Sequence, residues 1–182
     1  MPRAGYRARE PRERMPTSFH LRVWTRFLVS VEDVWRARVD ALAPELGPWR
    51  ECFAPSGAPL SPEQLPPPVE TTVRPLGPLA AVRWPLRVTA LEPGVRWVDE
   101  SENALYARFV HEHLFERTAD GCRYVDAVTF TPRGRAQKAA AVLTQRMLVR
   151  RHEGYARALA ADPQATGVSV LRVRVEEAWD AA

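Results

Sequence analysis

The fold is decided by the stretch YARFVHEHLFERTADGCRYVDAVTFTP (residues 106–132), which has the pattern of one long β-hairpin. Side chains of a strand alternate between its two faces. On the first arm, one face is apolar apart from two histidines: Phe109, His111, His113 and Phe115. The opposite face is charged and suits solvent: Arg108, Glu112 and Glu116. The alternation therefore predicts a strand with one buried face.

The turn of this hairpin is expected at Asp120-Gly121, because a type I′ turn needs positive φ at both central positions. Folding back about this dipeptide pairs Ala119 with Cys122. The inner face then gains three facing pairs: Phe115 with Asp126, His113 with Val128, and His111 with Phe130. Titratable groups on an apolar sheet face indicate a pocket. A slip of one residue in the pairing would instead turn both histidines to solvent.

The composition is that of a soluble globular protein, with 46% hydrophobic and 26% charged residues among 182, and predicts one domain with tails. No apolar run approaches the roughly 18 residues that a membrane span needs. The first residues lack the apolar core of a secretory signal peptide. We therefore expect a cytoplasmic protein. The absence of a glycine-rich phosphate loop, a GxSxG motif and an HExxH motif removes the usual support for nucleotide-dependent enzymes and hydrolases.

Residues 1–17 are rich in arginine and proline and are expected to form a disordered, mobile arm. Five arginines and two glutamates fall within the first fourteen residues, so most of the formal net charge of +4 belongs to this arm. Charge therefore does not indicate a nucleic-acid partner, and no array of aromatic residues interleaved with basic ones supports such a partner. Cys52 and Cys122 lie far apart and in no metal-binding spacing, so we expect two reduced structural thiols.

The rest of the chain carries further strand and helix signals. Ser30 is an expected helix N-cap, with Asp33 three residues on as in a variant capping box. Pro85 would interrupt strand hydrogen bonding, so an edge position or a bulge is expected there. The expected elements are a strand at 19–28, a helix at 31–42, a second short helix from Pro44 to Gly47, a short strand near 71–74 within the proline-rich connection 49–78, strands at 79–91 and 95–100, the hairpin, a long helix at 135–160 and a last strand at 167–179.

This order of elements resembles the START/polyketide-cyclase superfamily (SRPBCC, helix-grip fold) over residues 19–160. The segments that carry the likeness are WPLRVTALEPGVRWVDES (84–101), ARFVHEHLFE (107–116) and YVDAVTF (124–130). They look most like the polyketide cyclase/dehydrase-like and ligand-binding groups. The resemblance implies an α+β fold in which a curved antiparallel sheet wraps one long C-terminal helix, with two short helices after the first strand. It implies a domain at 18–162 and leaves 163–182 as a C-terminal extension, which could add one strand.

The resemblance also implies a cavity for an apolar ligand between the sheet and the long helix. On that helix, Met147, Leu148 and Tyr155 share one side, whereas Arg146 and Arg150 belong to the opposite, solvated stripe. The residues expected to contact the ligand are Trp84, Phe109, His111, His113, Phe115, Tyr124, Asp126, Val128, Phe130, Leu143, Met147, Leu148 and Tyr155.

The polar members of this set, His111, His113 and Asp126, admit three interpretations. A zinc site would need Asp126 as its third ligand, and no cysteine or histidine cluster completes it, so neither a metal nor a cofactor is expected. As candidate catalytic residues, a histidine oriented by an aspartate would suit dehydration or aldol cyclisation of a polyketide. As a structural set, the three groups would satisfy one another beneath the helix.

The favoured function is therefore binding of a small hydrophobic molecule of lipid, polyketide or isoprenoid type. One alternative is a polyketide cyclase or dehydratase that uses the His/Asp set. Another is a protein-interaction module that uses the arginine-rich arm and the 49–78 connection, and a homodimer is left open. Asp99 and Glu100 are expected to form a solvated strand end, and the alternative is contact with a ligand at the cavity mouth. His20 and His152 are expected to be isolated histidines outside the site.

Overall fold

The computed structural model describes residues 17–46, 59–73, 82–134, 137–159 and 161–174. The predicted arm, apart from Thr17, and much of the 49–78 connection lie outside these residues. No helix in the described ranges is long and apolar enough to cross a membrane. The elements are β1 (Thr17–Phe27), α1 (Val31–Leu46), the short 3-10 helix η2 (Pro62–Gln64), β2 (Val69–Val73), β3 (Val82–Glu92), β4 (Arg96–Ser101), β5 (Tyr106–Thr118), β6 (Gly121–Pro132), α2 (Gln137–Ala158) and β7 (Ala161–Arg174).

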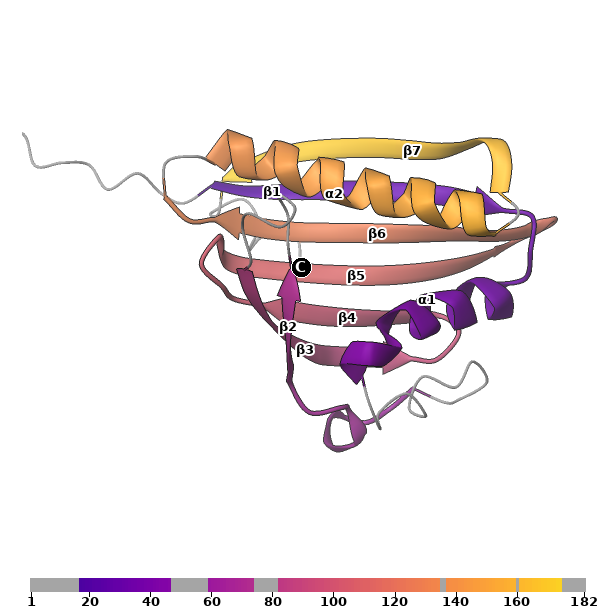
Figure 1. The fold of residues 1–182 in the computed structure, drawn as a ribbon, viewed down its shortest axis with the longest axis horizontal. Coiled ribbons are helices and arrows are strands. Elements are labelled where there is room, and N and C mark those ends of the chain that lie inside the picture. The colour runs from indigo at the N-terminus through magenta and orange to yellow at the C-terminus, as the bar shows by residue number, and fades with distance from the viewer. Residues whose placement is uncertain (1–16, 47–58, 74–81, 135–136, 160, 175–182) are drawn as a thin grey trace, which may run out of the picture.

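One antiparallel sheet holds all seven described strands, in the order β2-β3-β4-β5-β6-β1-β7. Figure 1 shows both helices on the same face of this sheet. The long helix α2 packs on β1, β6 and β7, whereas α1 packs mainly on β5 and β6. The predicted architecture, an antiparallel sheet covered by one long helix near the C-terminus, is therefore confirmed.

The predicted hairpin is present as β5 and β6, but its register differs by two residues from the expected one. Thr118 pairs with Gly121, so the turn is Ala119-Asp120 rather than Asp120-Gly121. The glycine serves a different purpose, because a Cβ on Gly121 would lie 2.0 Å from the backbone oxygen of Phe27 in β1. A shift of two residues preserves the face of every side chain, since the period of a strand is two.

The shifted register changes the facing pairs on the inner side. The pairs are Phe115 with Tyr124, His113 with Asp126, His111 with Val128, and Phe109 with Phe130. The polar residues of the two arms are thus directly opposite each other, which the expected register did not provide.

Helix α1 begins as predicted and ends later. The backbone N–H of Asp33 donates to Oγ of Ser30 at 3.1 Å, so the expected N-cap is formed. The helix then continues through Pro44 to Leu46, and the predicted break into two short helices is wrong. Proline removes one hydrogen bond and crowds the preceding turn. At Pro44 this effect falls in the last turn of α1, where little helix remains to be disrupted.

Strand β3 changes its partners near Pro85. It pairs with β2 from Val82 to Leu86 and with β4 only from Arg87 onward. Pro85 therefore has a strand neighbour on one side only, which agrees with the predicted edge position. The sheet consequently opens between the first half of β3 and the start of β5.

The last strand, β7, pairs antiparallel with β1 at the opposite edge of the sheet. The strand expected at 167–179 lies within β7 as far as Arg174, and residues 175–182 are outside the described part of the chain.

Two clusters of buried apolar side chains fill the layer between sheet and helices. The cluster that includes α1 contains, among others, Phe27, Val34, Trp35, Trp97, Phe115 and Tyr124. The cluster that includes α2 contains Phe19, Trp84, Tyr106, Phe109, Phe130 and Leu148.

Candidate functional site

The inner face of the hairpin carries the predicted polar set. His111, His113 and Asp126 are 4%, 2% and 0% exposed, respectively. They therefore share one buried face, which is the condition on which the sequence-based hypothesis depends. On the opposite face, Arg108 is exposed and Glu112 is half-buried, as the alternation predicts.

Asp126 is the centre of the set, because three imidazole rings surround its carboxylate. Its Oδ1 lies 3.1 Å from Nε2 of His111 and 2.9 Å from Nδ1 of His113. Its Oδ2 lies 3.2 Å from Nε2 of His152, and the hydroxyl of Tyr124 donates a hydrogen bond to Oδ1. Burial raises the pKa of Asp126, but His111 and His113 outweigh burial and hold this pKa well below its usual range. The carboxylate is therefore ionised at neutral pH.

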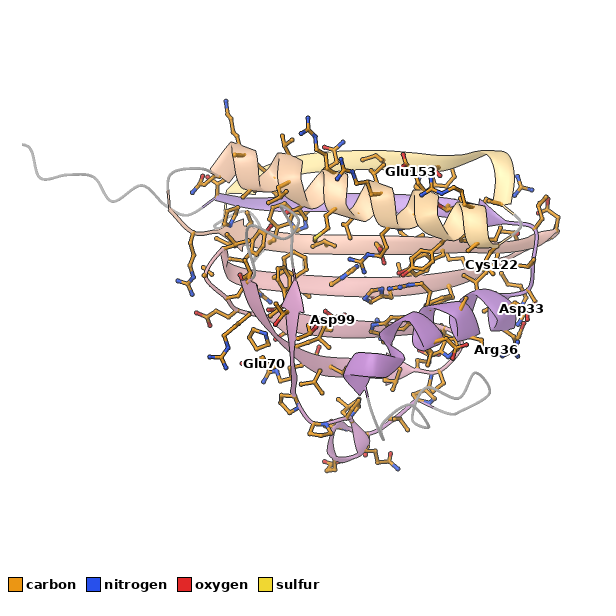
Figure 2. The ribbon with its side chains drawn as sticks, viewed as in Figure 1. Asp33, Arg36, Glu70, Asp99, Cys122 and Glu153 are labelled. Carbon is orange, nitrogen blue, oxygen red and sulfur yellow. The ribbon has the colours of Figure 1, made fainter. Side chains whose placement is uncertain are left out.

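Asp99 lies on the other side of His113 and is buried, so its predicted position at a solvated strand end is wrong. Its Oδ2 lies 2.9 Å from Nε2 of His113. Burial raises the pKa of Asp99, but the hydrogen bond from His113 lowers it below the ordinary value. The signal was present in the sequence, because Trp97, Asp99 and Ser101 alternate along β4 and all point inward. Figure 2 shows Asp99 among the side chains over the inner strands, whereas Asp33 and Arg36 lie on α1.

Arg38 joins the set from α1 and is 1% exposed. Its Nε donates to the hydroxyl of Tyr124 at 2.9 Å, and its Nη1 donates to the hydroxyl of Tyr155 on α2. The guanidinium also lies over three aromatic rings, at 4.6 Å from the centroid of Tyr155, 5.3 Å from Tyr124 and 5.8 Å from Trp97. Burial lowers the pKa of Arg38, but Tyr124, Tyr155 and Asp126 together raise it, so the group stays charged.

His152 joins the set from α2, and its prediction as an isolated histidine is wrong. The residue is fully buried, and Nδ1 lies 2.8 Å from Oγ1 of Thr25 on β1. The helical spacing of Thr144, Leu148 and His152 places all three on the buried side of α2. Arg38 follows Trp35 by three residues in the same way. Sequence reasoning missed both because it read buried helix faces from apolar residues alone.

Two polar atoms in this set have no hydrogen-bond partner among the described residues: Nη2 of Arg38 and Nε2 of His111. The His111 nitrogen is close to Asp126, but the orientation does not make a hydrogen bond. Burial lowers the pKa of His111 to about 4, and His113 adds to this lowering, so the ring is neutral at neutral pH. A buried polar group without a partner costs roughly 1–3 kcal/mol. Such groups therefore indicate where a bound ligand could interact.

The apolar residues predicted to contact a ligand lie in the layer around this set. Most are buried: Trp84, Phe109, Phe115, Tyr124, Val128, Phe130 and Leu148. Three from α2 are half-buried: Leu143, Met147 and Tyr155. At the surface where β3 leaves β4, an open pocket of about 350 Å³ is lined by the charged Arg87, Glu100 and Arg108 as well as by Leu86, Ser101 and Phe109. Sequence reasoning missed Tyr106, which is buried beside Trp84. Its hydroxyl is hydrogen-bonded to Oγ1 of Thr144 at 2.7 Å.

His20 and Glu100, which were also expected outside the site, lie outside it. His20 is half-buried on β1 and lies 2.8 Å from Oγ1 of Thr129, away from the polar set. Glu100 faces outward and forms an ion pair with Arg87.

Comparison with known proteins gives the chain a family. The family model described as a domain of unknown function, DUF8410, matches residues 25–159. The chain belongs to this family. The matched range contains every residue of the polar set described above, from Thr25 on β1 to Tyr155 on α2. No functionally curated protein matches the chain at a significant level.

Solved structures establish the fold of this DUF8410 domain. The protein CV1439 from Chromobacterium violaceum is 15% identical, with a TM-score of 0.51, and the match covers 74% of this chain and 94% of that one. The Zhui aromatase/cyclase from Streptomyces sp. R1128 is 12% identical, with a TM-score of 0.49 and coverage of 75% and 94%. Mll3558 from Rhizobium loti is 15% identical, with a TM-score of 0.48 and coverage of 75% and 97%. The match to CV1439 shows the fold of this chain, an antiparallel sheet covered by one long helix near the C-terminus, as its sequence indicated.

Proposed function

We propose that this domain binds a small, largely apolar molecule whose acidic or carbonyl oxygen interacts with Arg38. The observation that carries the proposal is the buried Nη2 of Arg38, which has no hydrogen-bond acceptor among the described residues. A guanidinium carries five N–H donors in a rigid fork that suits carboxylate and carbonyl oxygens. An acceptor on a ligand would supply the missing hydrogen bond.

The surroundings of Arg38 favour an otherwise apolar ligand. Its guanidinium lies over three aromatic rings, and the layer between sheet and helices is lined mainly by aromatic and aliphatic side chains. Burial of apolar ligand surface would contribute about 25 cal/mol per Å² before the costs of ordering. Lipid, polyketide and isoprenoid molecules with one acidic or carbonyl group meet this description. The opening between β3 and β5, with Phe109 and Ser101 in its lining, is the route we propose for the ligand.

Native mass spectrometry of protein purified from its own host tests the proposal. We expect a bound organic molecule on the wild-type chain and its loss in Arg38→Gln, because glutamine cannot supply the charged fork. Arg36→Gln is the matched control: Arg36 lies two positions away on α1, is exposed, and pairs with Asp33 at 3.0 Å. The proposal is wrong if the wild-type protein carries no molecule, or if Arg38→Gln retains it as Arg36→Gln does.

An enzyme of cyclase or dehydratase type is the second candidate, and the state of His111 favours it. A neutral imidazole with an unpartnered Nε2 can accept a proton from a bound substrate. His111→Gln should then abolish turnover of a polyketone substrate while leaving ligand binding intact. Retained turnover in His111→Gln would remove this candidate. Asp126 is a poorer test of catalysis, since its many contacts make a loss of stability the first consequence of its removal.

A further inference from the structure

We propose that Asp99, His111 and His113 form a binding site for a divalent first-row transition-metal ion of the zinc type. Each residue can offer one ligand atom such that all three atoms lie within 4.8 Å of one another, and all three side chains are buried. Zinc binds histidine nitrogen and carboxylate oxygen at about 2.0–2.2 Å in tetrahedral geometry, so two of its ligand atoms lie about 3.4 Å apart. Small side-chain adjustments are therefore enough to bring the three atoms around one ion.

The backbone holds these ligands together before any ion binds. His111 and His113 alternate on the inner face of β5, and their ring centroids are 3.8 Å apart. Asp99 is directly opposite His111 in the β4–β5 pairing. Sites on regular strands are positioned more rigidly than sites on loops.

Asp126 is not itself a proposed metal ligand; its carboxylate lies beside the ring of His113, which is one. Its Oδ1 lies 2.9 Å from Nδ1 of His113, and the same nitrogen is 2.8 Å from the hydroxyl of Tyr124, which itself donates to Oδ1. The other nitrogen of the same ring, Nε2, faces Oδ2 of Asp99 at 2.9 Å. Metal-binding histidines commonly donate their second N–H to a carboxylate, which fixes the ring and selects the ligating nitrogen.

The unpartnered nitrogen of His111 is an independent indication. Its residue is 4% exposed, and Nε2 makes no hydrogen bond among the described residues, although Oδ1 of Asp126 is only 3.1 Å away. A buried imidazole nitrogen that points into a cluster of carboxylates and a second imidazole, without bonding to any of them, is suited to a metal ion.

The structure therefore removes the objection that the sequence raised against a metal. The sequence offered Asp126 as the only third ligand for the histidine pair. The fold supplies Asp99 from β4 as that third ligand and leaves Asp126 to orient His113. The inference does not rest on the proposed organic ligand, since an ion can occupy this cluster in a protein that binds nothing else.

The test measures the metal content of the full chain by mass spectrometry. The protein is purified through an affinity tag that contains no histidine. Because the cluster is closed to solvent, the ion is supplied in two ways: zinc in the growth medium, and refolding from urea with Zn²⁺ or Co²⁺ followed by desalting. We expect about one ion per wild-type chain and visible d–d absorption of low-symmetry Co²⁺. The His111→Gln and Asp99→Asn variants should each retain at most about one tenth of the metal bound by the wild-type chain.

His20→Gln is the matched control, because His20 lies outside the cluster and should leave the metal content unchanged. His111→Gln is the decisive variant, since no hydrogen bond of its Nε2 is lost and circular dichroism can verify that it folds. Wild-type protein without metal after both treatments, or equal metal in His111→Gln and His20→Gln, overturns the inference. An organic molecule found by native mass spectrometry in metal-free protein would leave the proposed function standing and remove only the metal site.

Discussion

Nδ1 of His113 lies 2.9 Å from Oδ1 of Asp126, directly across the β5–β6 pair. This relationship exists because the hairpin turns at Ala119-Asp120, which moves the pairing by two residues from the expected register. A register in which His113 faced Val128 would have separated the two polar groups along the strand. The turn thus determines which side chain lies opposite the buried carboxylate.

Asp126→Asn should lower the free energy of unfolding by about 3 kcal/mol, because the substitution removes a buried ionised partner from three histidines and from Tyr124. Urea denaturation followed by circular dichroism measures the change. Glu112→Gln is the control: its carboxylate pairs with Arg96 at 3.2 Å at the surface, where such pairs contribute less than about 1 kcal/mol. Equal small effects in both variants would contradict the central role of Asp126.

The stability of the metal-free protein should fall as the pH drops from about 6.5 to about 4. Burial lowers the pKa of His111 to about 4 in the folded state, below its ordinary value of about 6.5. Within this window the unfolded chain binds more protons than the folded one, so acid favours unfolding, by as much as about 3 kcal/mol. The lowered pKa values of Asp99 and Asp126 extend the loss to still lower pH.

Urea denaturation across this pH range, with a chelator present, measures that dependence. His111→Gln should flatten the profile between about pH 6.5 and 4, because the titrating ring is gone. His20→Gln should keep the wild-type slope. A flat profile in the wild-type protein would show that His111 is not held neutral by burial.

Cys122 should be inert in the folded protein. Burial raises the pKa of its thiol to about 12, so almost no reactive thiolate exists at about pH 8. In a Cys52→Ser background, a maleimide reagent should label Cys122 only after urea is added, and mass spectrometry counts the label. Labelling of the folded protein as fast as the unfolded one would contradict this burial.

Gly121→Ala should destabilise the domain by about 2 kcal/mol, because its Cβ would lie 2.0 Å from the backbone oxygen of Phe27. Gly154→Ala is the matched control on α2, where no atom lies within 4 Å of the added carbon. Alanine favours a helix interior over glycine by about 0.5–1 kcal/mol, so this second variant should be more stable than wild type. Thermal unfolding of the two variants gives the comparison, and a neutral Gly121→Ala would be inconsistent with the observed packing of β6 against β1.

Much of the fold could be predicted from local patterns. Alternation in residues 106–132 indicates two strands with one buried face, and it remains correct under a register error of two residues. The long helix, the edge position of Pro85 and the N-cap at Ser30 are also local properties. The break expected at Pro44 was wrong, because the cost of proline depends on how much helix follows it.

The amino-acid sequence by itself determined the elements and the inward direction of His111, His113 and Asp126, because the period of a strand decides which side chains share a face. Only the tertiary structure decided what surrounds them. Arg38, Asp99 and His152 come from α1, β4 and α2, far apart along the chain, and they meet because the sheet and both helices enclose one layer. Which charges lie within a few ångströms of a buried carboxylate is a property of that packing, and the candidate chemistry of the site depends on it.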